Sequence, residues 1–207
     1  MGDNLQLLGF TAIPRLARKY GVNVESPAPY DLYGLTPVDS EKAIEDVGSI
    51  LSKFNELGAS WRDVYLASDI GMERMALAGE MQLNKCDLVL DVGCGRGYFT
   101  IAAANFVKRV VGLDLMDGYG RHGWWKNFAE SMDAVGLSDR VMGVRADVRH
   151  LPLMGSSFDG AVAVHSIRNF QDMTTIQTAI GEMKRVVVEG GSVIIAESLP
   201  IARNKAQ

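Results

Sequence analysis

The sequence predicts an α/β domain built on a doubly wound, mostly parallel sheet. From residue 86 onward, short β-branched runs alternate with stretches of helical periodicity. Strands that alternate with helices of about 10–15 residues require right-handed crossovers, which place helices on both faces of a parallel sheet. A length of 207 residues and a hydrophobic content of 47% are enough for one domain with a sizeable core.

The expected elements fall into three regions. Residues 1–37 hold four of the six prolines and only a short helical stretch near 13–20, so we expect an N-terminal arm or lid. Residues 38–84 carry two helical patterns that follow the capping sequences at Thr36 and Ser60, and we expect them to pack on the core. The third region is 85–207. Its expected strands are 87–92, 109–114, 140–146, 160–165 and 192–197, and its expected helices are 98–106, 121–135 and 172–187.

Composition excludes several classes of protein. The net charge of −4 disfavours a nucleic-acid partner, because proteins that bind phosphate backbones normally have an excess of basic residues. The two cysteines, Cys86 and Cys94, match neither a disulfide framework nor a metal cage, so we expect no metal and a reducing, cytoplasmic location. No apolar run approaches the roughly 20 residues of a membrane span.

The segment 89–99 carries the most specific motif. An apolar strand ends in Asp91, and glycines follow at alternate positions, at 93, 95 and 97. Such a turn lets a ligand lie against the backbone at the start of a helix. The dinucleotide motif Gly-x-Gly-x-x-Gly needs its third glycine at the position of Tyr98, so the spacing favours an adenosyl ligand without a pyrophosphate. The alternative is a glycine-rich turn that binds no ligand.

The pattern Asp-x-Gly-x-Gly-x-Gly resembles the nucleotide loop of class I S-adenosylmethionine-dependent methyltransferases, in particular the type 11-like group. The resemblance implies the Rossmann-like methyltransferase fold and S-adenosylmethionine as cofactor of the region 85–207. Asp114, which ends the second strand, would accept hydrogen bonds from the ribose, and Asp147, after the third strand, would accept one from the adenine amino group. The cofactor contacts implied in this way are Asp91, Gly93, Cys94, Gly95, Asp114, Leu115, Asp147, Val148 and His165.

A second, weaker resemblance concerns the segment after the fourth strand. Residues 165–170 and Glu197 are similar to segments of the ubiquinone and menaquinone biosynthesis C-methyltransferases. His165 and Arg168 are therefore candidate catalytic residues, His165 as a base and Arg168 as a cation for an anionic acceptor. The alternatives are that His165 only positions a hydrogen bond, and that Asn169 beside Arg168 caps a helix.

The function expected from these patterns is methyl transfer to carbon or oxygen of a small or lipophilic acceptor. An RNA, tRNA or protein methyltransferase that works with an activator subunit is the alternative within the class. Outside it, a NAD-dependent oxidoreductase and a non-catalytic adenosyl-binding module are the alternatives. Met72, Met75 and Met81 precede the glycine motif, where they either fill the core or line a substrate entrance.

The resembled fold has seven strands, whereas only residues 198–207 follow the fifth expected strand. We therefore expect that the C-terminal strands are missing. The natural chain would be longer, or a homodimer partner or a small activator subunit would cover this edge of the sheet.

Overall fold

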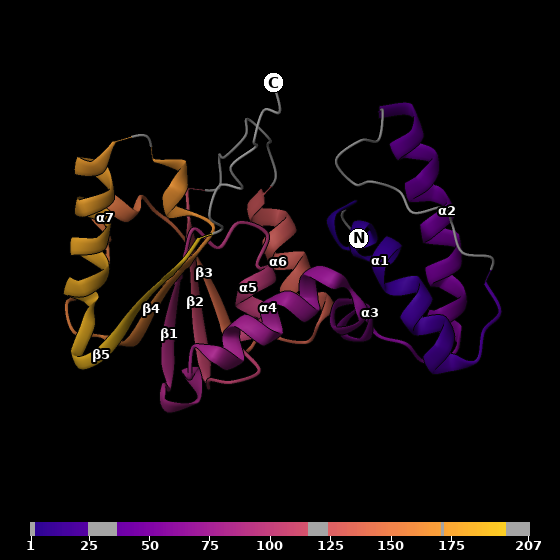
Figure 1. The fold of residues 1–207 in the computed structure, drawn as a ribbon, viewed down its shortest axis with the longest axis horizontal. Coiled ribbons are helices and arrows are strands. Elements are labelled where there is room, and N and C mark those ends of the chain that lie inside the picture. The colour runs from indigo at the N-terminus through magenta and orange to yellow at the C-terminus, as the bar shows by residue number, and fades with distance from the viewer. Residues whose placement is uncertain (1–2, 25–36, 116–123, 171, 198–207) are drawn as a thin grey trace, which may run out of the picture.

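The computed structural model describes residues 3–24, 37–115, 124–170 and 172–197. Its centre is a parallel five-stranded sheet in the order β3-β2-β1-β4-β5 (Figure 1). The strands are β1 (Leu88–Val92), β2 (Arg109–Asp114), β3 (Val141–Arg145), β4 (Phe158–Val164) and β5 (Val187–Ala196). The chain winds from β1 to one edge and then returns to the other, which confirms the doubly wound α/β fold. The direction reverses between β1 and β4, where such sheets place their ligands.

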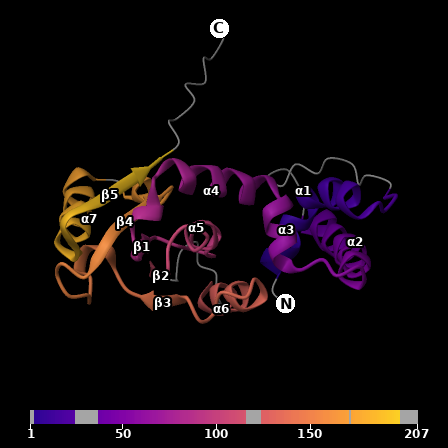
Figure 2. The same ribbon diagram turned by 90° about the horizontal axis from the view of Figure 1, so that it is seen from below.

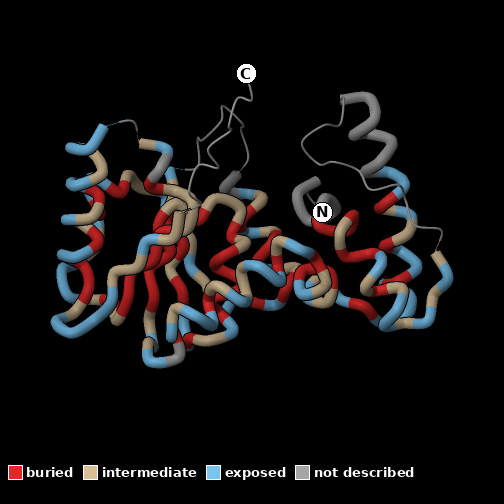
Figure 3. Tube along the Cα trace, in the orientation of Figure 1, coloured by how far each residue is buried: buried red, intermediate tan, exposed pale blue. Residues whose placement is uncertain are grey.

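Helices cover both faces of the sheet (Figure 2). Helices α5 (Tyr98–Ala103) and α6 (Trp124–Ala134) lie on one face, and α7 (Met173–Val186) lies on the other. Alternate residues of β1 accordingly enter different cores: Val89 packs with Phe99 of α5, whereas Leu90 packs with Met183 of α7. The buried strand residues form the interior of both layers (Figure 3). Among the described residues of this region there are also three short 3-10 helices, η1 (Leu83–Lys85), η3 (Val148–His150) and η4 (Ile167–Asn169).

The N-terminal helices are α1 (Asp3–Tyr20), α2 (Pro37–Glu56) and α3 (Trp61–Ala67). Helix α1 is longer than the expected stretch near 13–20. Buried Leu8, Ile13 and Leu16 pack it against the neighbouring helices, and this packing outweighs the helix-breaking tendency of Pro14. Residues 25–36 of the expected arm lie outside the described residues, and the three domain boundaries stay a prediction. Within the described part of the chain, no helix is long and apolar enough to span a membrane.

The second N-terminal helical pattern is divided at Ser68 into α3 and α4 (Asp69–Glu80). The predicted cap at Ser60 is present as a capping box with Asp63. The side chain of Ser68 caps α4 by accepting the N–H of Gly71, and it donates to the carbonyl of Tyr65. A Cβ at Gly71 would lie 1.8 Å from that carbonyl oxygen, so only glycine fits at this tight turn. The break sets the direction in which α4 runs toward the sheet.

Tyr65 joins the N-terminal helices to the glycine motif. Its side chain is buried, and its hydroxyl donates a 2.6 Å hydrogen bond to the carbonyl of Tyr98, the first residue of α5. Burial raises the pKa of Tyr65, so the hydroxyl keeps its proton and remains a donor. This bond fixes the start of α5 from outside the sheet.

We predict that Tyr65→Phe lowers the free energy of unfolding by about 1–2 kcal/mol, because the part-buried carbonyl of Tyr98 loses its donor. Urea unfolding measures the change. The control is Ser52→Ala, which removes an exposed hydroxyl that also bonds a backbone carbonyl and should change stability by less than about 0.5 kcal/mol. Equal effects of the two substitutions would contradict the role given to Tyr65.

Candidate functional site

The glycine motif forms the turn from β1 to α5. Gly93, Gly95 and Gly97 have φ values of 72°, 51° and 85°, a region that favours glycine. At two of the three positions there is also no room for a side chain. A Cβ at Gly93 would lie 2.3 Å from Cβ of Ser166, and one at Gly97 would lie 2.5 Å from Cε of Met132. The alternate spacing of the glycines is therefore a requirement of the backbone.

Asp91 lies directly before this turn and is 1% exposed. Its carboxylate accepts a 2.5 Å hydrogen bond from Oγ1 of Thr100 in α5. Burial, followed by the nearby charge of Asp114, raises the pKa of Asp91 to about 7, although the Thr100 bond and the positive charge of Arg74 act in the opposite direction. A cation near this carboxylate would stabilise its ionised form.

Two further carboxylates stand at the ends of neighbouring strands. Asp114 ends β2, and its Oδ2 accepts the N–H of Gly95 at 2.9 Å. Asp147 follows β3 and caps η3 by accepting the N–H of Arg149 at 2.9 Å. The guanidinium of Arg149 also pairs with Asp147 and is the main reason that the pKa of this carboxyl is lowered. Both groups are therefore already fixed by bonds within the chain.

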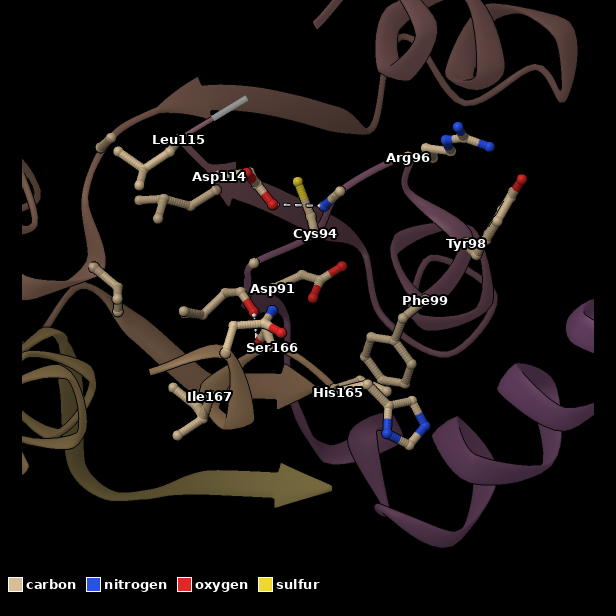
Figure 4. Close-up of a pocket in the computed structure, with 18 of the residues that line it drawn as sticks. Asp91, Cys94, Arg96, Tyr98, Phe99, Asp114, Leu115, His165, Ser166 and Ile167 are labelled. Atoms are coloured by element: carbon tan, nitrogen blue, oxygen red, sulfur yellow. Dashed lines mark hydrogen bonds between the residues drawn. The ribbon is translucent and has the colours of Figure 1, made fainter. Parts of the chain in front are cut away.

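These groups line one cavity of about 460 Å³ at the carboxyl ends of the strands (Figure 4). Every residue that the sequence predicted as a cofactor contact lies in its wall. Cys94 is buried there, and burial raises the pKa of its thiol well above the ordinary value, so the thiol stays protonated. Among the described residues, no group of three or more His, Cys, Asp or Glu side chains is arranged to hold a metal ion.

His165 follows β4 at the same edge of the sheet. Its φ of 53° is unusual for a residue other than glycine, and its N–H is anchored by a 2.8 Å hydrogen bond to the carbonyl of Ala196. The ring lies between two carboxylates: Nε2 is 3.9 Å from Oε1 of Glu73, and Nδ1 is 3.9 Å from Oε2 of Glu197. The imidazole therefore lies in the wall of the cavity between a carboxylate of α4 and one that directly follows β5.

The other predicted residues of this segment have different outcomes. The side chain of Arg168 lies outside the described part of the structure, so its predicted role is not tested. Asn169 lines the cavity and does not cap α7, because Asp172 is the cap residue of that helix. Met72 is exposed, whereas Met75 packs against the core.

Sequence reasoning missed two residues of the cavity. Ser166 donates its hydroxyl to the carbonyl of Val92 and occupies the space beside Gly93. Arg74 reaches the cavity from α4, a helix that precedes the sheet. Ser166 lies in the segment 165–170 that the sequence analysis singled out, but no role was predicted for it, and no motif marks Arg74.

Comparison with known families adds to this geometry. The family model described as "Methyltransferase domain" matches residues 90–195, which run from β1 to β5. The chain belongs to this methyltransferase domain family. Its matched segment contains the glycine turn, all three strand-end carboxylates and His165, while α1–α4 lie outside it.

Curated relatives of this methyltransferase domain include two with long alignments. A demethylmenaquinone methyltransferase of Porphyromonas gingivalis is 28% identical over 175 residues, which cover 81% of this chain and 67% of the relative. A sterol 4-C-methyltransferase of Caenorhabditis elegans is 28% identical over 119 residues, which cover 58% of this chain and 33% of the relative. The chain thus spans between one third and two thirds of the length of these relatives.

Solved structures share the fold of the methyltransferase domain. A Methanococcus maripaludis protein assigned to the S-adenosylmethionine-dependent methyltransferases aligns with a TM-score of 0.54 and 21% identity, covering 64% of this chain and 59% of that one. A candidate methyltransferase of Bacillus halodurans aligns with a TM-score of 0.52 and 25% identity, covering 61% and 52%.

We predict that Gly93→Ala lowers the free energy of unfolding by about 1–3 kcal/mol or more. The new Cβ meets Ser166, and the backbone is in the left-handed region. Gly181→Ala on α7 is the matched control. Its Cβ meets nothing within 4 Å, so it should stabilise the helix by about 0.5–1 kcal/mol. Chemical denaturation measures the free energy of unfolding of both variants. A Gly93→Ala protein as stable as the wild type would contradict the predicted clash with Ser166.

A second prediction concerns pH. Folded Asp91 keeps its proton up to a pKa of about 7, whereas the unfolded residue loses it near pH 4, so between these values the group makes stability fall as pH rises. Asp91→Asn retains an acceptor for Thr100 but cannot ionise. As pH rises from 5.5 to 8, the free energy of unfolding of Asp91→Asn should therefore increase by about 2 kcal/mol relative to that of the wild type. Urea unfolding of both proteins at both pH values tests this prediction. A difference in free energy of unfolding that is the same at both pH values would show that Asp91 does not titrate in this range.

Proposed function

We propose that the protein binds S-adenosylmethionine in the cavity at the strand ends and transfers its methyl group to a small or lipophilic acceptor. The observation that carries this proposal is the arrangement of carboxylates. Asp91, Asp114 and Asp147 lie at the carboxyl ends of three adjacent strands of a methyltransferase domain and line one cavity beside the glycine turn.

The residues fit the parts of this cofactor. Asp114 would accept hydrogen bonds from the ribose hydroxyls; a carboxylate can accept about four, and the N–H of Gly95 is one of them. Asp147, with Val148 beside it, would face the adenine, and Asp91 would face the ammonium group. The glycine turn lets the cofactor approach the backbone, since no side chain can stand at Gly93 or Gly97.

When bound, S-adenosylmethionine supplies a methyl group on a positively charged sulfur. The task left to the protein is to align the acceptor atom with that methyl group at about 3 Å and to exclude water. His165 stands at the edge of the cavity, and Glu73 and Glu197 would balance the charge of its ring if it took a proton from the acceptor. Phe99, Ile167 and Phe170 supply apolar surface for the acceptor.

The chemical class of the acceptor is inferred from the curated relatives and from the residues that line the cavity. By their names, the relatives from Porphyromonas gingivalis and Caenorhabditis elegans act on demethylmenaquinone and on a sterol, both of which are lipophilic molecules. We infer an acceptor of similar character for this chain, methylated at carbon or oxygen. Arg168, by its place in the segment after β4, is proposed to hold an anionic form of that acceptor.

The exposed edge of β5 is the proposed contact for a second copy or a small activator subunit. Within the described sheet, β5 pairs with β4 only, and Ile195 on it is exposed. Light scattering measures the mass of the purified chain, alone and after co-expression with a candidate activator subunit. A cofactor-binding monomer in both cases would refute this proposal.

We predict that calorimetry detects micromolar binding of S-adenosylmethionine and S-adenosylhomocysteine and no binding of NAD. In Asp114→Ala, the affinity should fall about ten- to a hundredfold, because bonds to a charged acceptor are lost. Asp139→Ala, at an exposed turn residue away from the cavity, is the matched control and should bind as the wild type does. Binding of NAD instead of S-adenosylmethionine would overturn the proposal.

The acceptor is tested with cofactor that carries a labelled methyl group. Quinone precursors, sterols, small phenols and total RNA are supplied in parallel reactions. Transfer to the lipophilic molecules supports the proposal, whereas label found only in RNA would favour an RNA methyltransferase. Binding of cofactor without transfer to any class would favour a non-catalytic adenosyl-binding module.

A further inference from the structure

The two carboxylates that flank the ring of His165 differ in burial. Glu197 directly follows β5, its side chain is 24% exposed, and its Oε2, the atom 3.9 Å from Nδ1 of His165, is buried. Glu73 comes from α4, and its side chain is 60% exposed. Water and salt screen a charge at the surface much more than a buried charge. At the same distance from the ring, Glu197 therefore acts on it more strongly than Glu73 does.

Glu73 also shares its charge with a second cation. Its Oε2 lies 2.8 Å from Nη1 of Arg74, whereas its Oε1 is the atom 3.9 Å from Nε2 of His165. The guanidinium is closer to Glu73 than the imidazole is, and it compensates part of the negative charge that the ring would otherwise meet. Both differences make Glu197 the stronger acceptor for a proton of the ring.

The register of the sheet places Glu197 beside His165. Strands β4 and β5 are parallel, and Val164 pairs with Ala196 at the end of their ladder. The N–H of His165 continues this ladder with its 2.8 Å bond to the carbonyl of Ala196. The φ of 53° at His165 is unfavourable for a residue other than glycine, and such a conformation persists where the surrounding structure holds it. The backbone thus brings the imidazole and the carboxylate together before any ligand binds.

These positions favour one tautomer of the ring. A neutral imidazole carries one proton, on Nδ1 or on Nε2, and the partner of each nitrogen decides which. Glu197 favours the proton on Nδ1. Nε2 then keeps its lone pair, on the side where the exposed Glu73 shows that solvent can enter. A distance of 3.9 Å is longer than a hydrogen bond, but such contacts at catalytic sites are often long without substrate and shorten when it binds.

We propose that Glu197 is a positioning residue that keeps the proton of neutral His165 on Nδ1, so that Nε2 is the base of the site. This inference rests on the proposed methyl transfer, and it names the acceptor group as an acidic hydroxyl, such as that of a phenol or an enol. A base is needed only where the acceptor has a proton to lose.

The step balances as follows for transfer to the hydroxyl oxygen. Nε2 takes the hydroxyl proton, and the oxygen forms a bond to the methyl carbon. The bond from that carbon to sulfur breaks, and its electron pair stays on the sulfur, which becomes a neutral thioether. The positive charge is then on the imidazolium, next to Glu197, and the proton leaves to water.

Nitrogen-15 NMR measures the tautomer directly, because protonated and unprotonated ring nitrogens have separate chemical shifts. The chain has three histidines, so the signal of His165 is assigned by its loss in His165→Asn. At alkaline pH, where the ring is neutral, the wild type should carry the proton on Nδ1. Glu197→Met should move the proton to Nε2, toward Glu73, whereas the matched variant Glu73→Met should leave it on Nδ1.

Transfer assays with labelled cofactor and phenolic acceptors connect the tautomer to the reaction. Loss of a general base costs about 10²- to 10⁴-fold, so Glu197→Met, which keeps the base in the wrong tautomer, should lower kcat by about tenfold or more with little change in KM. Glu197→Gln keeps a weaker acceptor for Nδ1–H and should recover part of both the tautomer and kcat. Glu189→Met, at an exposed carboxylate of β5, is the control and should react as the wild type does.

The outcomes separate this inference from the proposed function. A wild-type ring with its proton on Nε2, or an unchanged tautomer in Glu197→Met, would overturn the role of Glu197 even in an active methyltransferase. The expected tautomers with equal kcat in the wild type and Glu197→Met would overturn Nε2 as the base. Failure to bind S-adenosylmethionine in calorimetry would instead overturn the proposed function. Should Glu197→Met fail to fold, the wild-type tautomer and Glu197→Gln decide, and an unchanged tautomer in Glu197→Gln refutes the inference.

Discussion

The turn from β1 to α5 has no room for a side chain at Gly93 or Gly97, and the position of the cavity depends on this constraint. Ser166 occupies the space beside Gly93, and Met132 occupies the space beside Gly97. The N–H groups of Gly93 and Cys94 donate to the carbonyl of Leu113 at 2.7 and 3.1 Å. The ends of β1, β2 and β4 are thereby held together around the same space.

The charges around that space are arranged before any ligand enters. Arg149 pairs with Asp147, Thr100 bonds Asp91, and the backbone of Gly95 bonds Asp114. These bonds orient the carboxylates, and the charge of Asp114 still contributes to the raised pKa of Asp91. A preorganised wall loses little entropy when it binds a ligand.

The sequence predicted the parts of the site that follow from local rules. Left-handed backbone favours glycine, and parallel strands end at one edge of the sheet, so the motif and the carboxylates could be placed in advance. The start of β5 at Val187 was not predicted, since the expected strand begins at 192, and the ladder with β4 is irregular between Phe158 and Gly160. Arg74 also escaped prediction, since its place in the cavity depends on how α4 packs against α5 rather than on any motif.

The N-terminal helices and the glycine turn share one continuous hydrophobic core. Leu16 of α1 and Phe54 of α2 belong to the same cluster as Val89 of β1 and Ile101 of α5, whereas the face under α7 forms a separate cluster. The two faces of the sheet thus differ in cooperativity: opening α1–α3 removes support from α5, but opening α7 does not. A ligand held at the glycine turn would consequently slow amide exchange in helices that it never touches.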